Sequence, residues 1–174
     1  MGPPTISRLA AALSAVVLAG CATTERLDAA RDVHALMLAV RDDDRASFTA
    51  HVDKPALEAR MQAMLVDRAR AAALPAALTA ASVLASGPLS RWAGEALIRP
   101  QVFRAVADYY GYGPDAPLPG IVALATVLQP LPGGRVCAAR SRSDKNCLLV
   151  FAREGETWKL SDFAPSALSP RAPR

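Results

Sequence analysis

The thiol of Cys21 lies at the end of a segment with the features of an export signal. Arg8 gives the start of the chain a positive charge, and Leu9 to Leu18 is an almost unbroken apolar stretch. A helix of about ten apolar residues rises only about 15 Å, roughly half the thickness of a bilayer's hydrocarbon core. We therefore expect the segment to target the chain to a membrane and not to span it. Because a thiol is a nucleophile, covalent modification of Cys21 is the first chemistry that the sequence suggests.

The residues Leu18-Ala19-Gly20-Cys21 resemble the lipobox of bacterial lipoproteins. In lipoproteins the cysteine thiol receives a diacylglyceryl group, and a dedicated peptidase cuts just before it. The resemblance implies that Leu18, Ala19 and Gly20 form the signal-peptidase motif and that Cys21 is the lipid acceptor. Cleavage after residue 20 of 174 would leave a mature chain of 154 residues. Ala22, where an aspartate often retains lipoproteins at the inner membrane, slightly favours the outer membrane. The alternatives are an ordinary secretory signal with a coincidental cysteine, or a buried N-terminal helix.

Cys137 and Cys147 remain as an even pair once the first cysteine is lipidated. An oxidising compartment would permit a disulfide between them. They fall in two adjacent expected strands, and we expect them to share one face of the sheet with Leu149 and Phe151. The bridge would close a loop of about ten residues and contribute at most about 3 kcal/mol by loop entropy. Residues 144–146, which have the composition of a turn, do not lie midway between the two cysteines. This register therefore requires a bulge or a wider loop. Two buried thiols are the alternative.

Other residue types that can perform chemistry have spacings that favour structural roles. The run at 42–44, Asp-Asp-Asp, lacks the glycine and glutamate positions of a calcium loop, and we interpret it as a break between helices. His34 and His51 have no Cys or His partner at ligand spacing, and we interpret them as ordinary helix residues. The chain contains neither a Gly-x-Ser-x-Gly elbow nor a phosphate-binding glycine loop. The sequence therefore identifies no catalytic, cofactor-binding or metal-binding residue. It does not support an enzymatic function, but it does not exclude one.

Aromatic residues gather beside a Gly/Pro-rich segment. If Tyr109, Tyr110 and Tyr112 are exposed, they are a candidate contact patch, because tyrosine offers a large contact area at a low entropic cost. For the nearby Trp92 and Phe103, a place in the core between the last helix and the sheet is favoured.

The charge of the chain is modest. The formal net charge of +4 falls to +3 when Arg8 is removed with the export segment, and acidic and basic residues are interspersed. A nucleic-acid-binding protein is expected to gather its basic residues in a patch, so no nucleic-acid partner is predicted. The basic residues of the expected strands either face anionic headgroups near the anchor or guard strand edges; they are Arg135, Arg140, Arg142, Lys145 and Arg153.

Helical spacing dominates the chain up to residue 110. Apolar residues recur at intervals of three and four over 27–41, Asp44 is a candidate N-cap, and Asp53 precedes a helix with Pro55 in its first turn. Further helices are expected on either side of Ser86-Gly87-Pro88 and after Arg99, because Gly and Pro interrupt the pattern. The expected helices are 27–41, 45–51, 54–74, 75–85, 90–98 and 100–110.

The periodicity changes after a Gly/Pro-rich loop at 111–120. Residues 121–127 suit a strand or a short helix, and 134–142, 146–152 and 157–163 suit three antiparallel strands. The predicted fold is therefore α+β, with a helical N-terminal two-thirds packed on a small C-terminal antiparallel sheet of three to four strands. The expected organisation is a signal peptide (1–20), a lipidated N-terminus and short tether (21–26), one α+β domain (27–163) and a disordered tail (164–174).

Several short motifs resemble domain-of-unknown-function family 2939, a set of exported or membrane-anchored bacterial proteins. The pattern is a helix, an aspartate turn and a "VD-x-P-x-L" element that opens an amphipathic helix, present here as Val52-Asp53-Lys54-Pro55-Ala56-Leu57. Further matches are Leu97-Ile98-Arg99-Pro100 and Gly155-Glu156-Thr157-Trp158-Lys159-Leu160. The resemblance covers about 32–163 and implies location and fold. Because the family has no assigned activity, it supplies no catalytic residue.

These features predict a protein of the bacterial envelope that is held in the membrane by an N-terminal lipid and faces the periplasm. We expect it to be a binding or structural partner of another envelope component, through a helix groove or the tyrosine-bearing loop. The alternative is a small-ligand-binding or enzymatic domain with a pocket between helices and sheet, and a lipid carrier with an apolar groove is a third possibility. A deep pocket with two convergent ionisable groups would favour the ligand-binding alternative.

Overall fold

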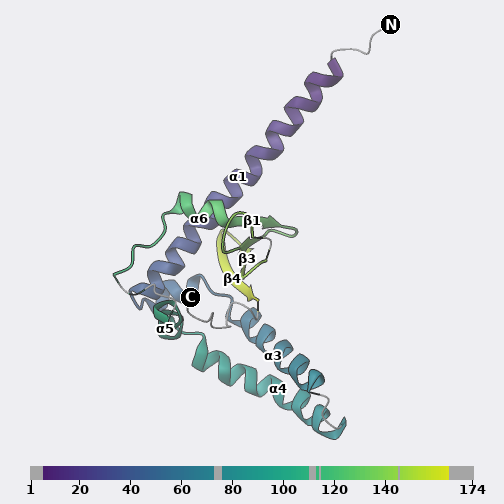
Figure 1. The fold of residues 1–174 in the computed structure, drawn as a ribbon, viewed down its shortest axis with the longest axis vertical. Helices are drawn as coiled ribbons and strands as arrows, with labels where there is room; N and C mark the ends of the chain where they lie inside the picture. Colours follow the sequence, from purple (N-terminus) through teal and green to yellow (C-terminus); the bar gives the residue numbers. More distant parts are fainter. Residues whose placement is uncertain (1–5, 73–75, 110–112, 114, 145, 165–174) are drawn as a thin grey trace.

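The computed structural model of the chain describes residues 6–72, 76–109, 113, 115–144 and 146–164. Within these residues six helices precede a four-stranded antiparallel sheet, so the fold is α+β as predicted (Figure 1). The helices are α1 (Ile6–Arg41), α2 (Arg45–Ala50), α3 (Lys54–Ala71), α4 (Ala76–Leu97), α5 (Pro100–Tyr109) and α6 (Ile121–Val127). The strands are β1 (Leu128–Leu131), β2 (Arg135–Ala138), β3 (Leu149–Glu154) and β4 (Thr157–Phe163).

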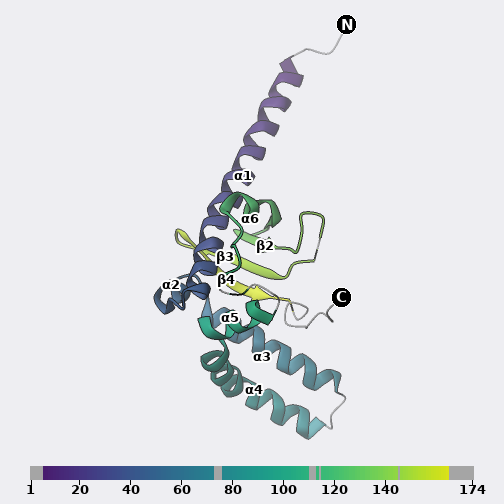
Figure 2. The same ribbon diagram turned by 60° about the vertical axis from the view of Figure 1, so that its left-hand side comes forward.

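The two halves of α1 have different surroundings. The first half extends away from the other elements toward the N-terminus, whereas the second half runs alongside the sheet and contacts β1, β4 and α6 (Figures 1 and 2). Ala29, Val33 and Leu36 are buried in this second half, at the spacing that predicts a helix from residue 27. The helix begins at Ile6 because the apolar stretch Leu9–Leu18 is also helical and joins it without a break.

The sheet is a meander with the strand order β1-β2-β3-β4. On its inner face Val136 lies opposite Phe151, and Phe151 lies opposite Leu160. These three side chains and Trp158 are at most 2% exposed, and they share one core with buried residues of α1. The main core therefore lies between the second half of α1 and the sheet.

β1 forms one edge of the sheet and has no counterpart among the three strands located from the sequence. It contains Pro130, which lacks a backbone N–H and is tolerated on edge strands. Residues 121–127, for which strand and helix were both open, form α6, and β1 follows directly.

The other edge of the sheet is tied to the segment between α2 and α3. Val52 forms a parallel bridge with Leu160, the backbone N–H of Asp53 donates to Leu160 O at 2.9 Å, and that of Leu160 donates to His51 O at 2.9 Å. Asp53 then caps α3, because its Oδ1 accepts from the backbone N–H of Ala56 at 3.0 Å. The predicted cap of α3 is confirmed, and it fixes the start of α3 against β4.

α3 and α4 form a helical hairpin at the end of the molecule opposite the N-terminus (Figures 1 and 2). The expected break at Ser86-Gly87-Pro88 is wrong, because α4 is one helix that passes through Pro88. A proline inside a helix removes one backbone donor, and the Oγ of Ser90, two residues after Pro88, donates to Gly87 O at 2.9 Å. Packing along α3 holds the two parts of α4 in one helix.

Candidate functional site

The residues of the lipobox-like motif, Leu18, Ala19, Gly20 and Cys21, lie in α1. Residues 22–26, the expected tether, continue this helix, and among the side chains whose burial is described, from Thr23 on, Ala29 is the first that is buried, eight positions after Cys21. Eight helical residues rise about 12 Å, so Ala29 lies about that far along α1 from Cys21. None of the helices in the described part of the chain is both long enough and apolar enough to cross a bilayer.

The aromatic cluster divides into a buried and an exposed part. Phe103 packs edge-on against Phe48 with ring centroids 5.2 Å apart, which confirms its predicted place in the core. Trp92 is 68% exposed on α4, so its predicted core position is wrong; the face of α4 that carries it points away from α3. Tyr109 ends α5, and the other two residues of the candidate patch, Tyr110 and Tyr112, lie outside the described residues.

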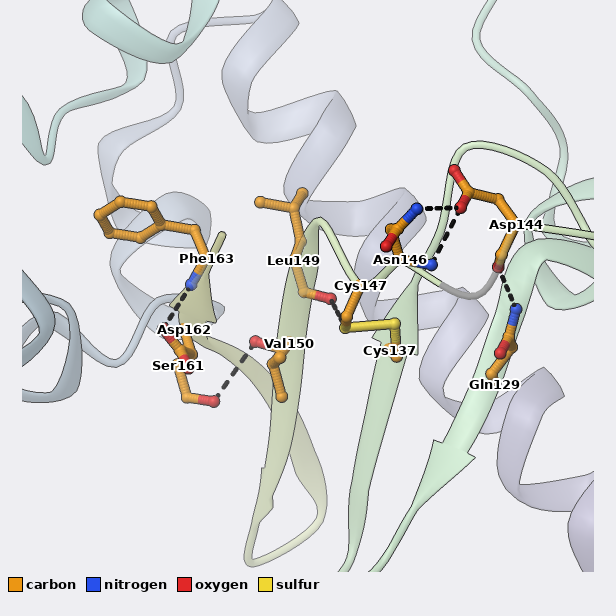
Figure 3. The surroundings of a disulfide bond; sticks show 10 residues. All are labelled: Gln129, Cys137, Asp144, Asn146, Cys147, Leu149, Val150, Ser161, Asp162 and Phe163. Carbon is orange, nitrogen blue, oxygen red and sulfur yellow. Dashed lines mark hydrogen bonds between the residues drawn. A yellow bond between two sulfur atoms is a disulfide. The ribbon is translucent and has the colours of Figure 1, made fainter. Parts of the chain in front are cut away.

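Cys137 and Cys147 form a disulfide with their Cα atoms 5.4 Å apart (Figure 3). The predicted pair is confirmed, but the predicted sheet face is wrong. Cys137 lies opposite Val150, whereas Phe151 lies opposite Val136 on the inner face. The two cysteines therefore sit on the side of the sheet away from α1, because the alternation along β3 places Val150 and Phe151 on opposite faces.

The disulfide closes a wide loop between β2 and β3. Gln129 Nε2 donates to Asp144 O at 2.9 Å, and Asp144 Oδ1 accepts from the backbone N–H and the side-chain amide of Asn146 at 2.9 and 3.0 Å (Figure 3). β2 ends at Ala138 and β3 begins at Leu149, so both strands are shorter than predicted. The residues that the off-centre turn leaves without a partner in the sheet lie in this loop.

A cluster of polar side chains joins α1 to the β3–β4 hairpin and was not found from the sequence. We call it the Asp28–Asp32 cluster. Asp32 Oδ2 accepts the backbone N–H of Trp158 at 2.7 Å, and Asp28 Oδ2 accepts the indole N–H of Trp158 at 3.2 Å. The guanidinium of Arg153 lies 3.6 Å from Asp28 Oδ2 and 5.9 Å from the centre of the indole ring. The cluster consists of Asp28, Asp32, His51, Arg153 and Trp158.

His51 is the member of this cluster that most resembles a catalytic group. Its Nε2 lies 3.6 Å from Asp32 Oδ1 and its Nδ1 lies 2.7 Å from Ser47 O. An acid–histidine pair can activate a hydroxyl or thiol nucleophile, but in the described part of the chain no hydroxyl or thiol is hydrogen-bonded to this ring. The pair instead connects α1 to the end of α2.

The aspartate run between α1 and α2 forms a turn with internal partners. Arg41 Nε donates to Asp42 Oδ1 at 2.7 Å, and this hydrogen bond lowers the pKa of Asp42. Asp44 accepts from the Oγ of Ser47 at 2.6 Å and from the backbone N–H groups of Ser47 and Ala46, which lowers the pKa of Asp44. Asp43 has φ 55°, a conformation that aspartate tolerates in turns. The run thus ends α1 and caps α2.

His34 and Arg135 have hydrogen-bond partners, whereas Arg140 and Arg142 are exposed. His34 Nδ1 lies 3.1 Å from Pro119 O, which joins α1 to the segment before α6. Arg135 Nε donates to Pro132 O at 3.1 Å in the β1–β2 turn. Arg140 and Arg142 are exposed, and Lys145 lies outside the described residues.

No protein-family model, curated protein or solved structure matches the chain.

Proposed function

We propose that the chain is a lipoprotein of the bacterial envelope, anchored through Cys21, that faces the periplasm and binds another envelope component. The proposal rests on one observation: the apolar stretch Leu9–Leu18 runs directly into the motif Leu18-Ala19-Gly20-Cys21, with Leu18 shared by both. The pairing of Cys137 with Cys147 supports it, because disulfides persist in oxidising compartments outside the cytoplasm. The outer-membrane preference drawn from Ala22 and the resemblance to family 2939 stay predictions.

The arrangement of the elements is compatible with this role. α1 leads from the position of Cys21 to the core, and the α3–α4 hairpin lies at the opposite end of the molecule (Figures 1 and 2). An anchor at Cys21 would therefore leave the hairpin directed away from the site of attachment. A lipoprotein's two or three acyl chains hold far more firmly than one.

A binding role is better supported than a pocket between helices and sheet. Trp158, Phe151 and Leu160 fill the inner face of the sheet and are almost completely buried, whereas Leu89 and Trp92 of α4 are 48% and 68% exposed. Exposed apolar side chains that lie together mark interaction sites more often than catalytic ones. Four of the six exposed large apolar side chains among the described residues thus lie on the hairpin.

The test is the intact mass of the protein extracted from bacterial membranes, measured for the wild type and for Cys21→Ser. The wild type is expected to begin at Cys21 with two or three acyl chains, and Cys21→Ser is expected to lack them. The matched control is the double variant Cys137→Ser/Cys147→Ser, which removes two thiols but keeps the lipobox, and should still carry the lipid.

Alkylation before and after reduction gives an independent count of thiols. A lipidated and bridged wild type should take up no alkyl group before reduction and two afterwards. A wild-type chain that keeps its first 20 residues, or that begins at Cys21 without acyl chains, would contradict the proposed anchor.

A further inference from the structure

α6 is the helix nearest to the part of α1 that projects toward the N-terminus (Figures 1 and 2). It is held against the second half of α1, because Leu124 is buried in a core that it shares with residues of α1, and His34 Nδ1 of α1 lies 3.1 Å from Pro119 O just before α6. The position of α6 is therefore fixed relative to Cys21, the site of the proposed lipid anchor.

The outer face of α6 is apolar and carries no charge. Val122, Ala123 and Thr126 are exposed, and these three positions span about 100° of an α-helix. The side chain of Val122 is 73% exposed. Residues 116–134, which include α6 and β1, contain no charged side chain, whereas the solvent side of a surface helix is normally covered by charged and polar residues. An uncharged outer face instead suits contact with the boundary between headgroups and acyl chains of a bilayer.

A basic loop lies at the same end of the domain. The uncharged segment is followed at 135–145 by four basic residues and one acidic residue. Arg140 and Arg142 are exposed in the loop between β2 and β3, which lies at the level of α6 along the long axis of the molecule (Figure 2). The acidic residue, Asp144, accepts two hydrogen bonds from Asn146 at 2.9 and 3.0 Å. An apolar face with basic residues at its edge complements a bilayer that contains anionic lipids.

Arg26 gives independent evidence for an anion near the proposed anchor. Its Nε is buried and has no hydrogen-bond partner in the described part of the chain, and a buried donor without a partner is unfavourable. Arg26 follows Cys21 by five positions on α1, and helical side chains lean toward the N-terminus of their helix. Guanidinium groups bind phosphate oxygens in a bidentate geometry. A lipid phosphate beside the anchor would supply the missing acceptor.

We propose that the domain docks on the surface of the bilayer in which it is anchored, through a face that binds the headgroups of anionic phospholipids. This docking face consists of Arg26, Val122, Ala123, Arg140 and Arg142. The inference rests on the proposed lipid anchor and extends it, because acyl chains hold only the end of the chain, whereas the docking face sets the orientation of the domain. The α3–α4 hairpin is then held away from the membrane.

The test places a polarity-sensitive fluorophore on the docking face of the full lipidated chain, in vesicles of phosphatidylcholine and phosphatidylglycerol. Because Cys21 is acylated and Cys137 is bridged to Cys147, the variant Val122→Cys has one thiol to label. Its emission is expected to shift to shorter wavelength and to be quenched by nitroxide-bearing lipids. The matched control is Leu89→Cys on the hairpin, which is 48% exposed in the unchanged chain and whose label should stay in water.

Charge variants, read out by the label at residue 122, test the basic residues of the docking face. Arg140→Glu/Arg142→Glu should lower the ratio of docked to undocked domain by about thirtyfold or more, and Arg26→Gln by about fivefold, because each basic residue at an anionic surface adds a similar attraction. The matched control Arg68→Glu/Arg91→Glu makes an equal change of charge at exposed residues of the hairpin and should change the ratio by less than about twofold.

Three results would overturn the docking and leave the anchor intact: an acylated chain whose label at residue 122 stays in water, an equal or larger response of the label at residue 89, or equal effects of the two double charge variants. A chain whose intact mass shows no acyl chains would overturn the proposed function and the docking together. The intact mass is measured on the same preparation, so the two failures are distinguishable.

Discussion

Asp32 illustrates how one side chain connects two ends of the chain. It lies on α1, and its carboxylate accepts the backbone N–H of Trp158, a residue that is completely buried on β4. Water cannot replace this acceptor easily, because α1 covers the site. The hydrogen bond therefore contributes to stability mainly through the desolvated N–H that its loss would leave without a partner.

We expect Asp32→Ala to lower the free energy of unfolding by about 1–3 kcal/mol, the penalty for an unsatisfied buried donor. Asp32→Asn should have a smaller effect, because the amide oxygen can still accept the hydrogen bond. Urea denaturation followed by circular dichroism measures both. Equal losses for the two variants would show that charge, and not the hydrogen bond, determines the contribution of Asp32.

Asp44 provides a prediction about pH. Hydrogen bonds from Ser47 Oγ and from backbone N–H groups favour the ionised carboxylate and lower the pKa of Asp44 in the folded chain. Its contribution to stability is therefore fully present above the ordinary aspartate pKa of about 3.9 and is lost as the pH falls through the lowered pKa of the folded state. Removal of the hydroxyl donor should shift the pKa of Asp44 upward.

The variant for this test is Ser47→Ala, and NMR titration of the Asp44 carboxyl carbon is the measurement. The matched control is Thr49→Ala, because Thr49 is also a hydroxyl residue of α2 but donates to Arg45 O at 2.8 Å instead of to Asp44. An equal change in the Asp44 pKa in both variants would contradict the assignment.

The sequence contains only a weak signal for the Asp28–Asp32 cluster. The two aspartates are four residues apart and flank the buried Ala29 on a helix whose apolar face was correctly predicted. Their acceptor roles depend on Trp158, which lies 126 and 130 residues away along the chain. Local periodicity shows that carboxylates border the core, but it contains no information about which distant donor they meet.

At the scale of elements, the hairpin depends on the close approach of α3 and α4 at Gly94. Alanine there would favour the helix by up to about 1 kcal/mol, but its Cβ would overlap Cγ and Oε1 of Glu58. We expect Gly94→Ala to destabilise the protein by about 1–3 kcal/mol through overpacking. The double variant Gly94→Ala/Glu58→Ala removes the overlapping atoms and should recover most of this loss.

A double-mutant cycle in urea measures the coupling between residues 58 and 94. Glu58→Ala alone completes the cycle and accounts for the loss of the Lys54–Glu58 ion pair, whose atoms lie 3.6 Å apart. If the effects of the two single variants simply add, the close approach of the two helices at Gly94 is not the cause.

The elements that were predicted correctly are those with local causes. Asp44 and Asp53 cap their helices through hydrogen bonds that span two or three residues, and the β3–β4 turn uses Gly155 at φ 62°, where a residue without Cβ is favoured. The errors have non-local causes. α4 continues through Pro88 because α3 packs along it, and β1 forms around Pro130 because β2 supplies a partner. The face of Cys137 depends on the register between β2 and β3, and a shift of one residue reverses a strand's faces.

At the scale of the whole molecule, burial is concentrated where α1 meets the sheet. Trp158, Phe151 and Val136 are at most 1% exposed there, while the hairpin carries several of the exposed large apolar side chains. The hairpin joins the core through contacts of α3 with β4 and the bridge between Val52 and Leu160. Segments with few buried contacts open at a lower free energy than the core.

We therefore expect hydrogen exchange to show two levels of protection, with slow amides in β3 and the second half of α1 and faster amides throughout α4. Asp53→Ala removes the cap of α3 and should speed exchange in the hairpin by about fivefold, the equivalent of about 1 kcal/mol, while β3 stays unchanged. Asp53 lies between the two parts of the molecule, because it caps α3 and also donates its backbone N–H to Leu160 O. The substitution keeps this backbone hydrogen bond. If exchange in β3 rises as much as in α4, the hairpin and the core unfold as one cooperative unit.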